Sequence, residues 1–580
     1  MKIFVVSKKV QSRALHNLTD SFLDSILQQL GPTLSQYKGG NIIDVFPGEG
    51  LFSRKLHDLL QPKCHYVIES KHHTNAQDWA DKMDELGPSY ALSLWEETAT
   101  YRDIKSKASA AVSEHALWSD VIKHCGELPW LNSSTTAEDV NTNTLLIVNT
   151  SRLARGAGTR SKKVSARHAT SQTFTRILFE DLLYREGVHK HGVVRCLLWV
   201  GQEEKSRFVP RTLRDQSKTT WRSTDAYCAQ EVTGHPAYET AGRRTPAHDV
   251  RSAWNVAKRM RHDGTELPEH RRSKLHQAVW ESVLAAEKDS TTGALGDELE
   301  ELERLQDALV RGEILRNRPH KEGEDKRRAH PTPEFARLQE LQEKFDKMTG
   351  LNANQPPITE AVLIAVSALR RLFRYERELR AKYPDGEYLE PQLSGEERDQ
   401  ISRMVVDVEN SLNAYSGREK RRMTNIWSYF DDDEALRLQP PTLDWDKRTY
   451  EPVACKDEEF DPPYALALID FQPIPNPAAV KRNLTALSSF TRLITNNAYE
   501  KIGHNLETIA HGAGTELIPQ CPTILDPAKR GHLNPQYINT RLLTHEMLAE
   551  LHEAWERWPF RVNDDTLRAR VLSGMIHEDV

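Results

Sequence analysis

The stretch IIDVFPGEGLFSRKLHD, residues 42–58, constrains the fold of this chain more than any other. It begins as an apolar run typical of a buried strand, breaks at Pro-Gly-Glu-Gly, and continues with helical spacing. Gly48 and Gly50 carry no side chain that would keep a ligand off the backbone, and the amides of the following helix point at the turn. A strand, a glycine turn and a helix in this order predict an α/β sheet with a ligand site at the turn.

The next strand carries an acid where a nucleoside ligand needs one. It reads HYVIES and ends near Glu69, 25 residues after Asp44. A carboxylate at this place can accept the hydroxyl hydrogens of a ribose, so the pattern favours a nucleoside cofactor. A phosphate-binding loop fits less well, because Leu51 and Phe52 stand where it needs Lys and then Ser or Thr. The alternative is a tight turn that only packs helix on strand.

The composition changes twice along the chain and predicts three regions. Residues 1–240 alternate strand-like runs, such as TLLIVN and VVRCLLWV, with helical stretches, as in an α/β domain. Residues 241–459 are highly charged and mostly helical, and their Pro-containing link at 316–334 predicts partial disorder. Residues 460–580 supply one more strand, YALALIDFQPIP, and a helical C-terminal domain.

Two apolar stripes and a capping pattern define helices in the middle region. Serine and glutamate at capping-box spacing, Ser394 and Glu397, predict the start of one helix. The stripes have steps of three and four residues, which predict amphipathic helices. Their members are Leu295, Leu299, Leu302, Leu305 and Leu309, and then Phe335, Leu338, Leu341, Phe345 and Met348.

Composition excludes several classes of protein. Among 580 residues, of which 38% are apolar and 28% charged, no apolar run approaches the roughly 20 residues of a membrane helix. The six cysteines are scattered without metal-site spacing, which predicts neither a disulfide framework nor a metal site, and favours a reducing compartment. The first 19 residues are basic and lack acids, as in an organelle-targeting segment or an ordinary basic terminus.

A long basic segment follows the strand TLLIV. No acidic residue occurs from Val140 to Phe179. Clustered basic side chains without compensating acids are typical of a surface that binds phosphate backbones, although a solvated basic loop has the same composition. We therefore predict nucleic-acid contacts from Arg152, Arg155, Arg160, Lys162, Lys163 and Arg167.

Together these motifs resemble a known family. IIDVFPGEGLFSRKL and HYVIES are similar to the first two motifs of the S-adenosylmethionine-dependent rRNA adenine N6-dimethylases. They resemble in particular the fungal branch of this family, the mitochondrial transcription initiation factors of the transcription factor B type. PPYALALIDFQPIP resembles the family's late strand, and Asp526 to Arg530 stand in the place of its Asp-Pro-x-x-Arg turn. The resemblance covers roughly residues 1–240 and 460–560. It implies a Rossmann-like methyltransferase fold with a C-terminal helical domain and a large charged insertion between the last strands of the sheet.

The resemblance also assigns a cofactor site. It implies S-adenosylmethionine, either bound or a vestige, with its methionine part beside Asp44, Gly48 and Gly50. Glu69 would hold the ribose, and Glu96 or its neighbour would lie near the adenine, unless these acids only begin a solvated helix. Phe46 departs from the pattern, because the family has a glycine at its position.

The fourth motif of the family bears on catalysis. The family has Asn-x-Pro-aromatic after strand four, where the amide and the ring hold a flipped adenine. This chain has Asn149-Thr150-Ser151-Arg152, which lacks both the proline and the ring. Loss of the stacked ring removes about 1–3 kcal/mol per base, although Arg can also stack on a base. We therefore expect little or no methyl transfer.

The resemblance implies a mitochondrial matrix protein that assists a single-subunit mitochondrial RNA polymerase. It would act as a monomer and bind promoter DNA or another single-stranded nucleic acid, RNA included. The alternative is an active rRNA adenine N6-dimethyltransferase whose fourth motif tolerates Ser151 and Arg152. A cofactor site kept only for folding is a third hypothesis.

Overall fold

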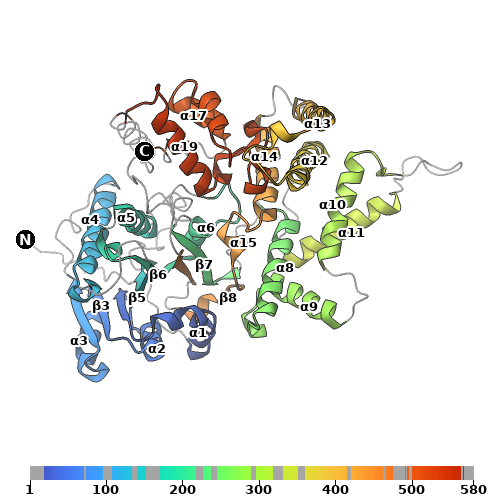
Figure 1. Ribbon diagram of the computed structural model, residues 1–580. Helices are drawn as coiled ribbons and strands as arrows, with labels where there is room; N and C mark the ends of the chain where they lie inside the picture. Colours follow the sequence, from blue (N-terminus) through green and yellow to red (C-terminus); the bar gives the residue numbers. More distant parts are fainter. Residues whose placement is uncertain are drawn as a thin grey trace, which may run out of the picture.

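A mostly parallel sheet of eight strands organises the protein (Figure 1). The computed structural model describes residues 19–70, 74–95, 107–132, 140–151, 170–184, 186–216, 226–236, 244–288, 295–317, 331–349, 360–413, 420–460, 465–474, 490, 493–494, 500–563 and 566. The strands are β2 (Asn41–Val45), β3 (Cys64–Ser70), β4 (Tyr90–Trp95), β5 (Val140–Asn149), β6 (Val193–Gly201), β7 (Tyr227–Gly234), β8 (Val453–Ala454) and β9 (Leu466–Pro473).

The strands lie in the order β4-β3-β2-β5-β6-β9-β7-β8. Strands β2 to β6 are parallel, whereas β9 is antiparallel to both of its neighbours, β6 and β7. The predicted α/β class and the strands expected from NIIDVF, HYVIES, TLLIVN, VVRCLLWV and YALALIDFQPIP are therefore confirmed.

Helices cover both faces of the sheet. They are α1 (Asp20–Leu34), α2 (Leu51–Leu60), α3 (Thr74–Leu86), α4 (Lys107–Gly126) and α5 (Thr170–Tyr184). Because side chains alternate along a strand, Ile42 and Leu197 pack with α1 and α2, while Ile43 and Leu198 pack with α4 and α5. Burial on both faces accounts for the nearly continuous apolar runs of the strands.

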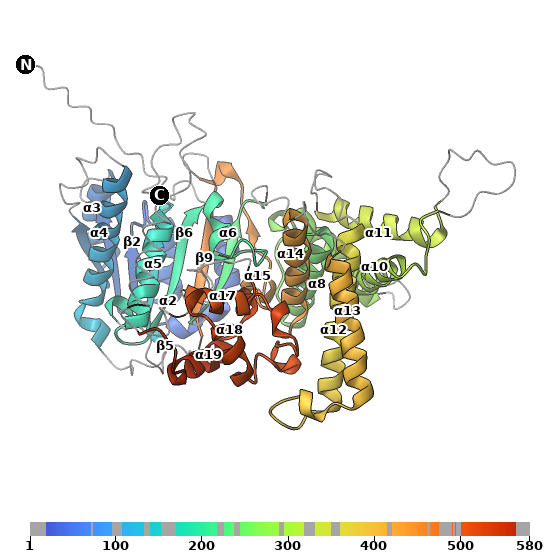
Figure 2. The same ribbon diagram turned by 90° about the horizontal axis from the view of Figure 1, so that it is seen from above.

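In the sequence, the charged middle region lies between β7 and β9, two strands that pair with each other in the sheet. Its helices are α8 (Pro246–His262), α9 (Lys274–Lys288), α10 (Leu295–Val310), α11 (Pro333–Thr349), α12 (Glu360–Lys382), α13 (Gly395–Asn413), α14 (Lys420–Arg437) and α15 (Asp444–Lys447). Figures 1 and 2 place them on the side of the sheet where β7 and β8 lie. The leucine stripe of α10 is buried in a core that continues into α1 and α2. The predicted amphipathic helices are thus confirmed, while residues 318–330 of the predicted disordered link lie outside the described residues.

Side-chain hydrogen bonds define the start of α13 and cover part of the edge of the sheet. The capping box before α13 is present, since Ser394 N donates to Glu397 Oε2 at 2.8 Å and Glu397 N donates to Ser394 Oγ at 3.3 Å. At the sheet edge, Asp444 of α15 accepts a hydrogen bond from the backbone N–H of Ala229 in β7, at 3.0 Å. This contact covers a strand edge that would otherwise be open to pairing.

Four consecutive acids of α14 are buried, which the sequence did not lead us to expect. Successive residues of a helix point about 100° apart, so four of them surround it. Each contacts a different residue: Asp431 contacts Lys501, Asp432 the backbone N–H of Leu213, and Asp433 and Glu434 contact Arg370 and Arg377 of α12. Helix α14 therefore joins the C-terminal helices and α12 to the loop before β7.

The C-terminal helices α17 (Ile502–Ile509), α18 (Ala513–Leu517) and α19 (His545–Arg557) have a core of their own. The Asp-Pro-x-x-Arg-like turn links them to α12, because Arg380 Nε lies 3.0 Å from Asp526 Oδ1. Asp526 also caps the short turn that follows it, accepting from Ala528 N at 2.9 Å. Across the part of the chain that the structure describes, no helix is long and apolar enough to span a bilayer.

Candidate functional site

The glycine turn follows β2 and opens α2, as the sequence predicts. Gly48 and Gly50 have φ values of 68° and 75°, in the left-handed region that glycine adopts without strain. Phe46 is also left-handed, with φ 59°, which is unusual for a bulky residue and costs of order 1–3 kcal/mol. Its buried ring packs edge-on against Trp118 of α4, with the ring centroids 5.8 Å apart. Phe46 thus anchors the turn to the layer of α4 and α5.

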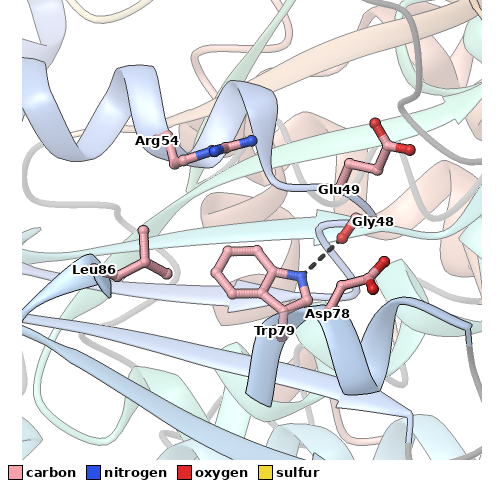
Figure 3. Close-up of a pocket in the computed structure, with 6 residues that line it drawn as sticks. All are labelled: Gly48, Glu49, Arg54, Asp78, Trp79 and Leu86. Atoms are coloured by element: carbon pink, nitrogen blue, oxygen red, sulfur yellow. Dashed lines mark hydrogen bonds between the residues drawn. The ribbon is translucent and has the colours of Figure 1, made fainter. Parts of the chain in front are cut away.

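The indole of Trp79, from α3, fills the space beside the turn. Trp79 Nε1 donates to the carbonyl oxygen of Gly48 at 2.8 Å, and a Cβ at Gly50 would lie only 2.3 Å from the ring (Figure 3). The pocket here leaves about 10 Å³, roughly the room for one water molecule. It is lined by Gly48, Glu49, Arg54, Asp78, Trp79 and Leu86. Because Gly50 has no Cβ, the indole of Trp79 can lie close to the backbone of the turn, where a ligand was expected.

The two acids predicted to hold the cofactor are both buried. Asp44 and Glu69 are each 1% exposed, and they lie on neighbouring strands. Asp44 Oδ2 accepts a hydrogen bond from His65 Nε2 at 3.3 Å, so it points into the sheet face that α2 covers. The turn and Asp44 thus make contacts within the protein, with Trp79 and His65 respectively. Glu96, predicted near the adenine, lies outside the described residues.

Asn149 ends β5, and its side-chain oxygen is already engaged. Asn149 Oδ1 accepts from the backbone N–H of Ser151 at 3.1 Å and from the Ser151 hydroxyl at 2.5 Å. A carbonyl oxygen has two lone pairs, so both are used and none remains for the amine of an adenine. All three residues from Asn149 to Ser151 are buried, and Thr150 Oγ1 donates to the carbonyl oxygen of Trp199 at 2.9 Å. The stretch forms a closed turn in place of a base-binding edge.

The predicted nucleic-acid contacts fall in the segment between β5 and α5. Arg152, Arg155, Arg160, Lys162, Lys163 and Arg167 lie outside the described residues. The structure places the two ends of their segment, Ser151 after β5 and Thr170 at the start of α5. The segment therefore begins at the carboxyl end of the parallel strand β5. Open α/β sheets bind their ligands at the carboxyl ends of their strands.

Residues 242–262 form a second basic stretch, a composition that suits either a nucleic-acid surface or a polar helix face. Three arginines of helix α8 contact other segments of the protein. Arg251 contacts Glu303 at 2.6 Å, Arg259 donates to the carbonyl oxygen of Arg448 at 2.8 Å, and Arg261 contacts Glu287 at 2.9 Å. These contacts favour a structural role for the stretch.

Two features of the site have no sequence motif. Trp79 belongs to no recognisable pattern, and neither do His65, buried beside Asp44, and the half-buried His57. The described residues contain no group of three or more His, Cys, Asp or Glu side chains placed to hold a metal ion. All six cysteines are free thiols.

No protein-family model matches the chain, and no curated protein is significantly similar to it.

Proposed function

We propose that this protein is a nucleic-acid-binding transcription initiation factor built on a methyltransferase-like sheet. It assists a single-subunit mitochondrial RNA polymerase in opening promoter DNA, and it acts by binding, without methyl transfer. The observation that carries the proposal is the engaged oxygen of Asn149, which leaves the fourth motif without a free acceptor for an adenine amine.

The strand order supports the methyltransferase-like part of the proposal. Counted along the chain without β8, the strands lie in the order 3-2-1-4-5-7-6, with the seventh antiparallel. This is the Rossmann order 3-2-1-4-5-6 with one added strand. An antiparallel last strand between the fifth and sixth is the form that the fold takes in S-adenosylmethionine-dependent methyltransferases.

The glycine turn and the basic segment support binding over catalysis. Trp79 occupies the turn, so the fold is maintained there without a cofactor. The basic segment starts at the end of β5, next to the altered motif, and its charges suit the phosphates of a single strand. The localisation and the polymerase partner come from the family resemblance alone.

The test compares methyl transfer with strand binding in the same preparation. Radioactive S-adenosylmethionine and a small-subunit rRNA hairpin measure transfer, and fluorescence anisotropy with labelled single-stranded DNA measures affinity at several salt concentrations. We expect no transfer and a salt-dependent affinity. Changing Arg152, Arg155, Lys162 and Lys163 to Ala should flatten the salt slope by up to about 3, since each phosphate contact on a single strand contributes about 0.7.

A matched control removes four exposed basic side chains elsewhere: Arg261, Arg311, Lys347 and Lys529. It should leave the salt slope unchanged. Methyl transfer above background would establish the dimethyltransferase alternative, and equal slopes for both variants would remove the basic segment from the binding surface. Promoter opening by the matching polymerase, followed with a base analogue in the promoter, then tests the role in initiation.

A further inference from the structure

A chain of three hydrogen bonds runs beneath the glycine turn, from Ser89 to Asp44. Ser89 precedes β4, His57 belongs to α2, His65 to β3 and Asp44 to β2. Ser89 Oγ lies 3.2 Å from His57 Nε2, the two Nδ1 atoms of His57 and His65 are 3.2 Å apart, and His65 Nε2 lies 3.3 Å from Asp44 Oδ2. The chain thus connects a half-buried hydroxyl to a fully buried carboxylate.

With both imidazoles neutral, only one arrangement of protons suits an ionised Asp44. The carboxylate only accepts, so His65 must carry its proton on Nε2 and leaves Nδ1 as an acceptor. His57 must then donate from Nδ1, and its bare Nε2 accepts the Ser89 hydroxyl hydrogen. Both imidazoles are neutral in this state, and every nitrogen has a partner.

Starting from two neutral imidazoles, this series of hydrogen bonds can take up one more proton but not two. A proton added at His57 Nε2 is accepted by the Ser89 oxygen once its hydroxyl rotates, and the positive imidazole is balanced by Asp44. A second proton added to the imidazoles has to enter at His65 Nδ1, the last bare ring nitrogen. Two N–H groups would then face each other across 3.2 Å, where only one hydrogen fits. The contact between α2 and β3 cannot survive that state.

Burial disfavours a positive charge on His57, and one aromatic ring covers both imidazoles. The ring of Tyr90 stacks on both imidazoles, with centroid distances of 4.2 Å to His57 and 4.7 Å to His65. Burial, and then the neighbouring His65, lowers the pKa of His57. The charged and titratable groups that face the histidines are Asp44 of β2, Tyr90 of β4, and Arg54 and Asp58 of α2.

We propose that the hydrogen bonds between Ser89, His57, His65 and Asp44 hold α2 and the glycine turn against the sheet. These hydrogen bonds tolerate one added proton, and a second added proton releases α2 and the turn. Leu51, which begins α2, directly follows Gly50, so movement of the helix moves the turn. The proposal does not rest on nucleic-acid binding, and its test uses no nucleic acid.

Hydrogen exchange followed by mass spectrometry tests it on the full chain at pH 7 and pH 5. Labelling times are corrected for the pH dependence of intrinsic exchange. We expect the amides of α2 to lose protection by about tenfold or more at pH 5, while amides of α19, in a separate core, do not change with them. The variant His57→Gln keeps a donor toward His65 but cannot take a proton, so its α2 should stay protected.

His262→Gln is the matched control, because His262 is 88% exposed at the end of α8 and should behave as wild type. If His57→Gln does not fold, His57→Phe preserves the stacking on Tyr90 and also lacks a proton site. Equal protection of wild-type α2 at both pH values overturns the proposal. So does an equal loss in the wild type and in the folded His57 variant.

Discussion

Ser151 donates two hydrogen bonds to one oxygen atom of Asn149, from its backbone N–H at 3.1 Å and from its hydroxyl at 2.5 Å. Both groups are buried, so the contact contributes to stability as well as closing the motif. Ser151→Ala removes one bond and should lower the free energy of unfolding by about 1 kcal/mol. Asn149→Ala removes both and leaves a buried donor, so it should cost about 2 kcal/mol or more. Urea titrations measure both values, and a larger loss for Ser151→Ala than for Asn149→Ala would contradict the arrangement.

Gly50→Ala should destabilise the protein through Trp79. The new Cβ would lie 2.3 Å from the indole, in addition to the cost of a non-glycine residue at φ 75°. We expect a loss above about 2 kcal/mol, measured by thermal or chemical unfolding. The control is Gly264→Ala, since Gly264 has φ 66° but no atom within 4 Å of a Cβ. It should show only the backbone cost, of about 1 kcal/mol.

A double-mutant cycle isolates the contact with the indole. Trp79→Ala alone should cost about 3–5 kcal/mol, because it empties a buried site. In that background Gly50→Ala should cost no more than Gly264→Ala does, which gives a coupling energy of at least about 1 kcal/mol. Additive effects would mean that Trp79 does not set the need for glycine at position 50.

The buried ion pair between β6 and β9 should be sensitive to the loss of one partner. Arg195 donates to both oxygens of Asp470, at 2.9 and 2.6 Å, and neither side chain is more than 1% exposed. Asp470→Ala leaves a buried guanidinium and should cost about 3–5 kcal/mol in chemical denaturation. The exposed pair between Arg261 and Glu287 is the control. Glu287→Gln should change stability by less than about 1 kcal/mol, and similar losses for the two variants would refute this prediction.

Stability should fall as the pH drops below about 6.5, the ordinary pKa of histidine. Burial lowers the pKa of His189 to about 3 and that of His276 to about 4. Between these values and about 6.5 the unfolded chain binds more protons than the folded one, so each histidine contributes up to about 1.4 kcal/mol per pH unit. Urea titrations at pH 7.5, 6 and 5 measure the slope.

His276→Leu checks the origin of that slope. Neither ring nitrogen of His276 has a hydrogen-bond partner among the residues that the structure describes, so an apolar residue of similar size should cost less than about 1.5 kcal/mol at neutral pH. The variant should lose its share of the pH dependence, whereas His262→Gln, at an exposed position, should retain it. An unchanged slope in His276→Leu would assign the acid sensitivity to other groups.

Local patterns predicted much of the fold. The strand runs, the glycine turn after Asp44, the stripe of α10 and the capping box at Ser394 each depend on residues a few positions apart, and each is present. The contact between Asn149 and Ser151 is also local, because the two residues are two positions apart, but it was not predicted from the sequence. The predicted domain boundaries, the cofactor and the basic binding surface remain predictions.

Short-range patterns therefore predicted five of the eight strands, the amphipathic helices and the position of the turn, since backbone conformation and amphipathic spacing depend on neighbouring residues. What occupies the turn depends instead on the packing of segments that are distant in the sequence. Trp79 lies 31 residues from Gly48 in the chain, and Ser89 lies 32 from His57, so no local pattern brings them together. The four acids of α14 make the same point, because carboxylates that look solvent-exposed in a sequence become buried when packing supplies each with a distant partner.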